Sequence, residues 1–415
     1  MILRKEAWRF DQDKINNCYK AGMKKIILLS ILMPFAMQLQ AQDAIKPAAD
    51  SLANLFLKNY TGSIVIGIHD NGREKIFYYG NDQMPDSNSH FELGEISESF
   101  TTALFAGMIV KGIVHEDDPL QKFLPVDIPS PVYQRVICRR PVEIPSNTGM
   151  GKDELHPISF TPFICLPDPS SKPQPILLCY LGTHTSGLPD KPFNLEKNKS
   201  NPFSDYTQED LYTFLKEYHI PEPIGFDYQH SHLGIALLGK ALCLKEKMSF
   251  DSLLAQNILI PLHMRNTWTN TGTKEKTLLL TGHSANRQNA EHWTSDIFAP
   301  AAGICSTPAD LMRFLAANIK KKKDLISNVL DFTHNPRMSP ERKSAPEIAL
   351  GWKISPFEKD KKIVWQEGIT GGFSSYIGFS ETDHFGVFVL SSVSVNVSDI
   401  GTVMLNKLAE ERLKE

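Results

Sequence analysis

The 415-residue sequence lacks the features that define several large classes of protein. Its charges nearly cancel, with 44 Lys and Arg against 47 Asp and Glu, so no strong positive charge favours a nucleic acid partner. It has only six cysteines, and no two of them have the C-x-x-C spacing of a structural zinc site or a redox motif. It also lacks the bias of disordered or fibrous chains, because 41% of its residues are hydrophobic and 22% are charged. The composition therefore indicates a globular protein.

Long hydrophobic runs are scarce, and the only one is too short to span a membrane. Residues 26–36 are apolar, well short of the roughly 20 residues that a membrane-spanning helix needs. Lys24 and Lys25 precede this run, and Ala41 follows it at a plausible cleavage point. The pattern predicts a signal peptide in a leader covering residues 1–41, with translation starting at Met23. We expect a secreted or periplasmic protein, residues 42–415, without a stable membrane anchor; the alternative is an N-terminal amphipathic helix.

A Pro-rich stretch, residues 126–180, has little periodicity. A segment of this length without regular structure is typical of a lid or a binding loop. Three of the six cysteines, Cys138, Cys165 and Cys179, fall within it. Export would place them in an oxidising compartment, where a disulfide within this stretch is one alternative and free thiols are the other.

Strand patterns gather at the two ends of the chain. Runs at 63–69 and 75–79 flank Asp70-Asn71-Gly72, a strong hairpin signal. Further strands are expected at 363–365, 375–379 and 387–391, and amphipathic helices at 44–57 and 397–413. The pattern predicts an α/β fold with one antiparallel sheet built from both chain ends and flanked by helices. A mostly helical region, residues 95–330, would be inserted between the two halves.

Short motifs spread from residue 91 to residue 391 resemble the serine β-lactamase and penicillin-binding-protein superfamily, in its class C-like branch. They are Phe91-Glu92-Leu93-Gly94, Phe100-Thr101-Thr102-Ala103-Leu104, His184-Thr185-Ser186-Gly187-Leu188-Pro189, Leu237-Leu238-Gly239, Ala302-Gly303-Ile304, Leu350-Gly351-Trp352 and Gly372-Phe373. The resemblance implies a β-lactamase/DD-peptidase-like fold and acyl transfer by the Ser of an S-x-x-K motif. It also implies a Tyr-x-Asn motif and a third motif, Lys-Thr-Gly or His-x-Gly, on the opposite wall.

All three of these motifs are altered here. The flanking residues place Glu95 at the nucleophile position and Glu98 at the Lys position. Counting back from Gly234 and Gly239 places His230 and His232 at the Tyr and Asn positions, and the third motif reads Gln366-Glu367-Gly368. The serine mechanism lacks both its hydroxyl and its amine. Ser97 is expected to point away from this helix face, and recruiting Tyr228 would break the spacing to Gly234.

Four altered positions that should meet in one pocket carry two carboxylates and two imidazoles. Such a set suits Zn²⁺, Mn²⁺ or Fe²⁺, so we predict a divalent metal held by Glu95, Glu98, His230 and His232, and no organic cofactor. The alternative is a metal-free, hydrogen-bonded salt-bridge cluster of the same residues. His184 is expected to have a structural role in its loop.

The favoured function is a metal-dependent hydrolase of amide or ester bonds in a small molecule or a peptide. Its predicted catalytic residues are the four metal ligands together with Gln366 or Glu367, which would orient the substrate, although Glu367 could equally face away. One alternative is an inactive pseudoenzyme that binds a peptide or a cell-wall fragment, and another is a residual serine-type hydrolase. The sequence indicates neither the exact substrate nor the oligomeric state.

Overall fold

The computed structural model describes residues 45–139, 164–195, 200–269, 278–319, 323–338, 346–358 and 361–414. The predicted leader and signal peptide, residues 1–41, lie outside the described residues. The centre of the Pro-rich stretch, residues 140–163, lies outside them as well.

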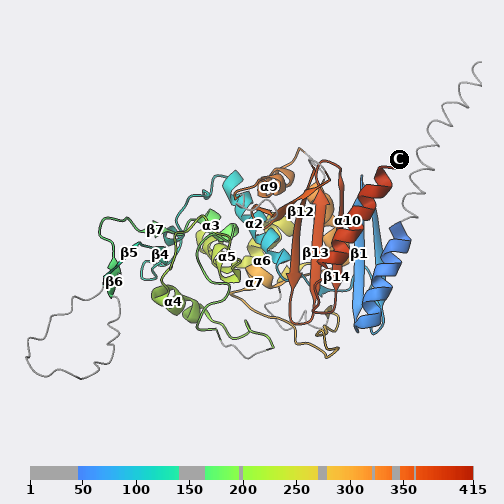
Figure 1. Cartoon of the computed structure of the whole chain (residues 1–415), viewed down its shortest axis with the longest axis horizontal. Helices are drawn as coiled ribbons and strands as arrows, with labels where there is room; N and C mark the ends of the chain where they lie inside the picture. Colours follow the sequence, from blue (N-terminus) through green and yellow to red (C-terminus); the bar gives the residue numbers. More distant parts are fainter. Residues whose placement is uncertain are drawn as a thin grey trace, which may run out of the picture.

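A seven-stranded antiparallel sheet formed by both ends of the chain is the centre of the fold (Figure 1). Its strands, in spatial order, are β10 (Glu347–Ile348), β11 (Lys353–Phe357), β12 (Lys361–Ile369), β13 (Ser374–Ser380), β14 (Phe385–Ser391), β1 (Ser63–Asp70) and β2 (Arg73–Gly80). The last strand pairs with the first, from Ile64 opposite Ser391 to Asp70 opposite Phe385. The predicted fold class, an α/β fold with one sheet built from both chain ends, is confirmed.

The turn between β1 and β2 follows directly from its sequence. Asn71 and Gly72 have φ angles of 48° and 85°, which a two-residue hairpin turn of this handedness requires at both positions. Strands β10 and β11 were not among the predicted strands. They are short and half-buried, and Pro356 interrupts the apolar alternation of β11. Strand β11 pairs with β12 and β10 pairs with β11, so neither depends on a local pattern alone.

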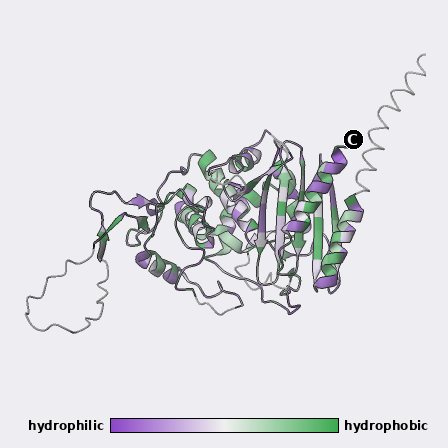
Figure 2. Cartoon of the chain, viewed as in Figure 1, coloured by the Kyte–Doolittle hydropathy of each residue, from purple (hydrophilic) through white to green (hydrophobic). Residues whose placement is uncertain are grey.

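Each face of the sheet is covered by helices. The helix at residues 45–59 and α10 (Ser398–Arg412) share one face, where Phe56 and Leu405 pack in the same apolar cluster as the strand residue Val389. Helix α8 (Pro308–Ile319) contacts the other face at β1, β13 and β14. Strand β1 is therefore buried on both sides, which explains its nearly continuous run of Ile and Val (Figure 2).

The region between the sheet halves is largely helical (Figure 1). Its helices are α2 (Ile96–Val110), α3 (Leu178–Gly182), α4 (Gln208–Glu217), α5 (His232–Glu246), α6 (Phe250–Leu254), α7 (Ala299–Ala302), α8 and α9 (Leu325–Thr333). Helix α2 is buried over all but its last two residues, because α5, α7 and α9 surround it while its first turns face β12. A small sheet, β3 (Phe91–Glu92), β9 (Ile304–Ser306) and β8 (Trp268–Thr269), leads directly into α2.

The described parts of the Pro-rich stretch form two short strand pairs. One joins β4 (Val132–Tyr133) to β7 (Gln174–Pro175), and the other joins β5 (Val136–Arg139) to β6 (Ile164–Pro167). Cys138 forms a disulfide, and the pairing of β5 with β6 places its backbone opposite Cys165, whereas Cys179 is a free thiol. Within the described ranges, every helix is too short or too polar to cross a lipid bilayer.

Candidate active site

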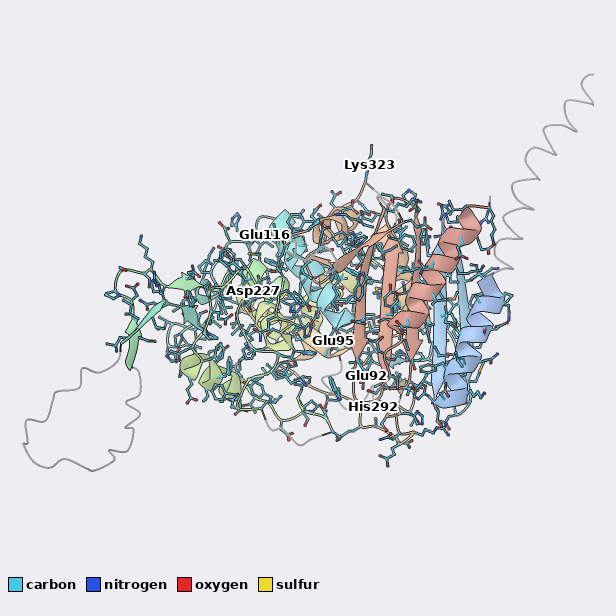
Figure 3. All side chains as sticks on the ribbon, viewed as in Figure 1. Glu92, Glu95, Glu116, Asp227, His292 and Lys323 are labelled. Carbon is cyan, nitrogen blue, oxygen red and sulfur yellow. The ribbon has the colours of Figure 1, made fainter. Side chains whose placement is uncertain are left out.

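Two glycines allow the start of α2 to lie very close to the end of β12. Gly94 has a φ of +54°, and a Cβ there would lie 2.6 Å from the backbone nitrogen of Ile369. A Cβ on Gly368 would lie 2.2 Å from the carbonyl oxygen of Leu93. Because neither position carries a side chain, the two backbones can approach closely. This places Glu95, the N-cap residue of α2, at the edge of the sheet (Figure 3).

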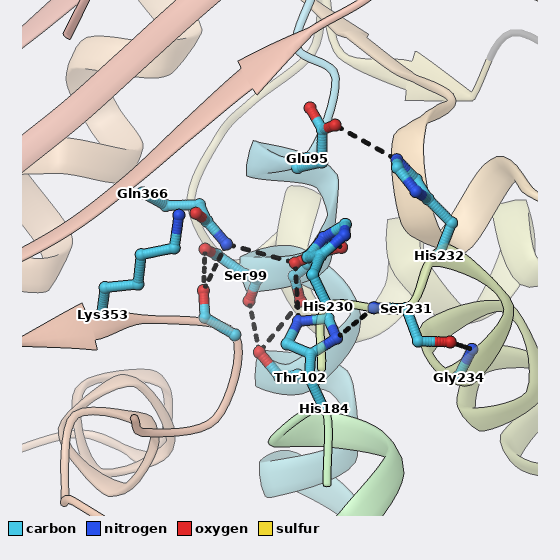
Figure 4. Close-up of polar contacts among 12 residues, drawn as sticks. Glu95, Ser99, Thr102, His184, His230, Ser231, His232, Gly234, Lys353 and Gln366 are labelled. Atoms are coloured by element: carbon cyan, nitrogen blue, oxygen red, sulfur yellow. Dashed lines mark hydrogen bonds and ion pairs between the residues drawn. The ribbon is translucent and has the colours of Figure 1, made fainter. Parts of the chain in front are cut away.

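Glu98 lies in the first turn of α2 and is completely buried. Its Oε2 is 3.1 Å from His184 Nε2 and accepts a hydrogen bond from Gln366 Nε2 at 3.2 Å. Its Oε1 is 3.0 Å from His230 Nε2. Three side chains from three separate segments, which Figure 4 labels, therefore contact one buried carboxylate.

His184 has a defined tautomer. The backbone N–H of Ser231 donates to His184 Nδ1 at 3.1 Å, so this nitrogen must present its lone pair. The ring proton therefore lies on Nε2, where it donates to Glu98. His184 has a φ of +57°, so the loop turns sharply at this residue to reach the carboxylate.

His230 and His232 flank Ser231, which caps α5 by accepting a hydrogen bond from the backbone N–H of Gly234. Their ring centroids are 4.8 Å apart, with the ring planes almost perpendicular. His232 Nε2 is 3.1 Å from Glu95 Oε1 (Figure 4). Glu95 Oε2 accepts the N–H of Ile369 at 2.7 Å.

Asp190 joins the two histidines from the opposite side. Its Oδ1 lies 2.5 Å from His232 Nδ1 and 3.3 Å from His230 Nδ1. Glu95, Glu98, His184, Asp190, His230 and His232 thus form one continuous network, here called the Glu–His cluster.

Charges within the Glu–His cluster shift each other's pKa values strongly. Burial alone would lower the pKa of both histidines, but the charge of Glu98 and hydrogen bonds to Asp190 and Glu98 raise the pKa of His230 to about 10. Hydrogen bonds to Asp190 and Glu95 raise the pKa of His232 to about 9. Burial would raise the pKa of Glu98 and of Asp190, yet the neighbouring imidazoles hold both well below their ordinary values. Without a metal, protons on His230 and His232 balance most of the carboxylate charge.

The four predicted metal ligands meet as two pairs rather than as one ring of four. Glu98 pairs with His230, and Glu95 pairs with His232. In this part of the described chain, donor atoms of three residues come within 4.8 Å of one another in two groups, Glu98–His184–His230 and Asp190–His230–His232. Glu95 belongs to neither group. A divalent ion with three protein ligands would therefore draw on Asp190 or His184, neither of which was predicted as a ligand.

Gln366 and Glu367 have different surroundings. Gln366 is buried and faces α2, where it donates to Glu98. Glu367 contacts Lys353 at 3.2 Å, Asn396 at 3.0 Å and the Ser398 hydroxyl, and has no hydrogen bond with the Glu–His cluster. Both residues line a hollow of about 220 Å³, together with Glu95, His230, Lys353, Gly368, Ile369 and Asn396. Glu367 thus borders the hollow, but its carboxylate is bonded to Lys353 on β11 and to Asn396 and Ser398 at the start of α10.

Ser97 and Tyr228 cannot supply the nucleophile and the base of a serine-type mechanism. Ser97 is fully buried, and its hydroxyl accepts the backbone N–H of Ile304 in the small sheet, on the side away from the hollow. Tyr228 packs edge-on against His184, with ring centroids 5.6 Å apart, and burial raises the pKa of its phenol far above the ordinary value. A phenol in that state stays protonated and is a poor base.

Two members of the Glu–His cluster, His184 and Asp190, were not among the predicted site residues. His184, expected to have a structural role in its loop, contacts the buried carboxylate of Glu98. Asp190 was not singled out; its only signal was its position directly after the motif ending at Pro189. Contacts among segments more than 40 residues apart bring both into the site.

Comparisons with known proteins agree with this fold. The family model described as Beta-lactamase matches residues 52–409. The chain is 23% identical to D-alanyl-D-alanine-carboxypeptidase/endopeptidase AmpH of Escherichia coli (strain K12), covering 75% of this chain and 73% of that protein. It is 21% identical to a β-lactamase of Lysobacter lactamgenus, covering 90% of this chain and 94% of that protein.

Solved structures give the same result for the fold. A β-lactamase/D-alanine carboxypeptidase from Yersinia pestis complexed with citrate is similar, with a TM-score of 0.68 and 22% identity over 87% of this chain and 95% of that one. A class C β-lactamase from Rhodobacter sphaeroides also has a TM-score of 0.68, with 18% identity over 89% of this chain and 99% of that one.

Proposed function

Because the chain belongs to the Beta-lactamase family, we propose that it is an exported, metal-dependent hydrolase of amide or ester bonds that works without a serine nucleophile. The single observation that carries the proposal is the Glu–His cluster, which lies at the start of α2 beside a hollow of about 220 Å³. Relatives named as a D-alanyl-D-alanine carboxypeptidase/endopeptidase and as β-lactamases favour a small-molecule or peptide substrate with a carbonyl to attack.

The residues of this chain have separate tasks in the proposal. A bound divalent ion would supply a water of lowered pKa as the nucleophile. The ammonium of Lys353 and the amide of Asn396 line the hollow and can donate to oxygens of the substrate. Gln366 also lines the hollow, and its carboxamide donates to Glu98 and holds that carboxylate. Glu95 borders the same hollow and is only partly buried, so it can accept a proton from the attacking water.

The disulfide at Cys138 supports export, because disulfides persist in oxidising compartments such as the periplasm. N-terminal sequencing of the protein recovered from the periplasm or the medium of the producing cells tests this part of the proposal. A mature chain beginning at Gln42 is the expected result.

A binding protein without turnover is the second candidate, and one observation favours it. Every member of the Glu–His cluster already has a hydrogen-bonding or ionic partner within the cluster, and Glu95 could act as a base only by losing its contact with His232. Such a protein would hold a peptide or a cell-wall fragment in the hollow without cleaving it.

An activity panel separates these candidates. The purified protein is supplied in turn with zinc, manganese and iron, and tested on amide and ester substrates with and without a chelator. We expect turnover that the chelator abolishes and that the double variant His230→Ala/His232→Ala lacks, while the exposed control His219→Ala keeps it. Binding of peptides without turnover under any metal would instead establish the second candidate. Labelling by a fluorescent penicillin would contradict both, because it requires a nucleophilic side chain.

A further inference from the structure

We propose that Asp190, His230 and His232 form the metal site, and that Glu95 and Glu98 are not ligands but hold the two imidazole rings in place. The ion would be bound by Asp190 Oδ1 and by the Nδ1 atoms of both histidines. This inference rests on the proposed function only for what the ion would do; the site itself is argued from the contacts below.

Asp190 Oδ1 already lies close to the Nδ1 atoms of both histidines. It is 2.5 Å from His232 Nδ1 and 3.3 Å from His230 Nδ1, and one donor atom from each of the three residues lies within 4.8 Å of the other two. Zinc–ligand distances of about 2.0–2.2 Å put neighbouring tetrahedral ligands roughly 3.3–3.5 Å apart. Binding of an ion therefore requires the distance between Asp190 Oδ1 and His232 Nδ1 to increase from 2.5 Å to about 3.3 Å.

The other nitrogen of each ring has the partner that a metal-bound histidine usually has. His230 Nε2 is 3.0 Å from Glu98 Oε1, and His232 Nε2 is 3.1 Å from Glu95 Oε1. A ligating histidine commonly donates its second N–H to a carboxylate, which fixes the tautomer and the ring orientation. Here both rings would donate through Nε2, and the ion would displace the proton that each Nδ1 carries in the metal-free protein.

The carboxylates of Glu95 and Glu98 are each held in place by a hydrogen bond from another part of the fold. Glu98 Oε2 contacts His184 Nε2 and accepts from Gln366 Nε2, and Glu95 Oε2 accepts the N–H of Ile369. Each carboxylate therefore has one oxygen fixed by the scaffold and the other directed at a histidine. That division suits a residue that orients a ligand better than one that binds the ion.

The competing group, Glu98–His184–His230, does not suit a cation. The N–H of Ser231 donates to His184 Nδ1, which leaves the ring proton on Nε2, the nitrogen that faces Glu98. An N–H directed at the carboxylate offers no lone pair there. His184 could bind an ion only by losing the hydrogen bond from Ser231 or by becoming an imidazolate.

The proposed site also leaves room for a further ligand. The side chain of Asp190 is 46% exposed and that of His230 is 32% exposed, while His232 is buried. His230 also lines the hollow. Three protein ligands with a solvent-facing side are the arrangement of catalytic rather than structural zinc sites.

Zinc binding by the purified full-length protein tests the proposal. Metal-free protein is mixed with zinc chloride, passed through a desalting column and analysed for bound zinc. We expect about one ion per chain, and a loss of affinity in Asp190→Asn of more than about 100-fold. Glu95→Gln and Glu98→Gln should bind about 10–100-fold more weakly, because they disturb only the ring-holding carboxylates. Asp227→Asn, an exposed aspartate on the neighbouring loop, is the matched control and should bind as the unaltered protein does.

X-ray absorption at the zinc edge of the unaltered protein gives a second measurement that does not depend on a variant folding. Two imidazole nitrogens with oxygen ligands are expected. The proposal is overturned if the unaltered protein retains no zinc, or if zinc binding survives Asp190→Asn and is lost in His184→Gln. Stoichiometric zinc that Asp190→Asn abolishes, without any hydrolysis, would refute the proposed function and leave this site standing. Full hydrolysis by metal-free protein would likewise refute the metal dependence of the proposed function, and the binding measurements alone decide the site.

Discussion

Glu98 shows at the scale of one residue how a buried charge determines its neighbourhood. The carboxylate is fully buried, and its partners come from the loop at His184, the segment before α5 and strand β12. A buried ion of this kind is tolerated only when its lone pairs are filled. The same contacts hold its pKa well below the ordinary value, so it stays ionised.

Replacing Glu98 by Ala should therefore destabilise the protein strongly. The donors of His184 and Gln366 would lose their buried acceptor, and we expect the free energy of unfolding to fall by about 3–5 kcal/mol. Urea unfolding followed by circular dichroism at pH 7 measures this. Glu222→Ala removes an exposed glutamate and should change the free energy by less than about 0.5 kcal/mol. Equal effects of the two variants would show that the Glu98 contacts contribute nothing.

The free thiols provide a pH-dependent prediction. Burial raises the pKa of the Cys179 and Cys243 thiols to about 11 and raises that of Cys305 well above its ordinary value. Only the thiolate reacts, so at pH 8 these residues should react with iodoacetamide on the order of 100-fold more slowly than in the urea-denatured chain. Because a raised pKa delays thiolate formation, the native rate should increase about tenfold per pH unit up to pH 11. Mass spectrometry of alkylated peptides follows each residue, and similar native and denatured rates would contradict the prediction.

At the scale of an element, α10 packs on the sheet through a glycine. A Cβ on Gly401 would lie 2.0 Å from Cδ1 of Tyr376, a β13 residue whose ring also covers Gly378. The close approach allows Met404 and Leu405 to enter the cluster on this face. The glycine lowers helix propensity, and the packing explains why it is present.

Gly401→Ala should therefore have the opposite sign from an ordinary helical Gly→Ala substitution. Instead of stabilising by a few tenths of a kcal/mol or more, it should destabilise by about 1–3 kcal/mol, because the added methyl group displaces the Tyr376 ring. Thermal unfolding with a matched Val403→Ala variant measures the difference, since Val403 is 47% exposed on the same helix. A raised melting temperature in Gly401→Ala would refute the close packing.

At the scale of the whole molecule, the two chain ends are interdependent. Strand β1 pairs with β14, and the helix at residues 45–59 and α10 share one apolar cluster over the sheet. The inserted helical region supplies Glu95, Glu98 and both histidines, while the sheet supplies Gln366. The candidate active site thus forms only when the sheet from both ends has closed around the insertion.

Removing α10 should therefore disrupt the entire molecule. A chain ending at Val397 leaves the strand face around Tyr376 and Val389 uncovered, and we expect aggregation or loss of cooperative unfolding. A chain ending at Arg412 keeps the helix and should behave as the full protein does. Gel filtration and near-ultraviolet circular dichroism compare the two, and a monomeric, cooperatively unfolding chain without α10 would contradict the interdependence.

The sequence by itself determined what depends on neighbouring residues. The Asn71-Gly72 turn, the alternation in the terminal strands and the apolar spacing of the last helix are local signals, and each reports on a few consecutive residues. The short motifs also led to the prediction that Glu95, Glu98, His230 and His232 share one pocket. Strands β10 and β11 could not be predicted in this way, because they form by successive pairing onto β12, β11 directly and β10 through β11.

Only the tertiary structure decided which side chains meet. It paired Glu98 with His230 and Glu95 with His232, added His184 and Asp190, and turned the carboxylate of Glu367 toward Lys353. The physical reason is that each contact joins segments distant along the chain, where no periodicity connects one residue to another. The partner of a buried charge depends on which donor the fold brings within about 3 Å, and the residue types alone do not determine that distance.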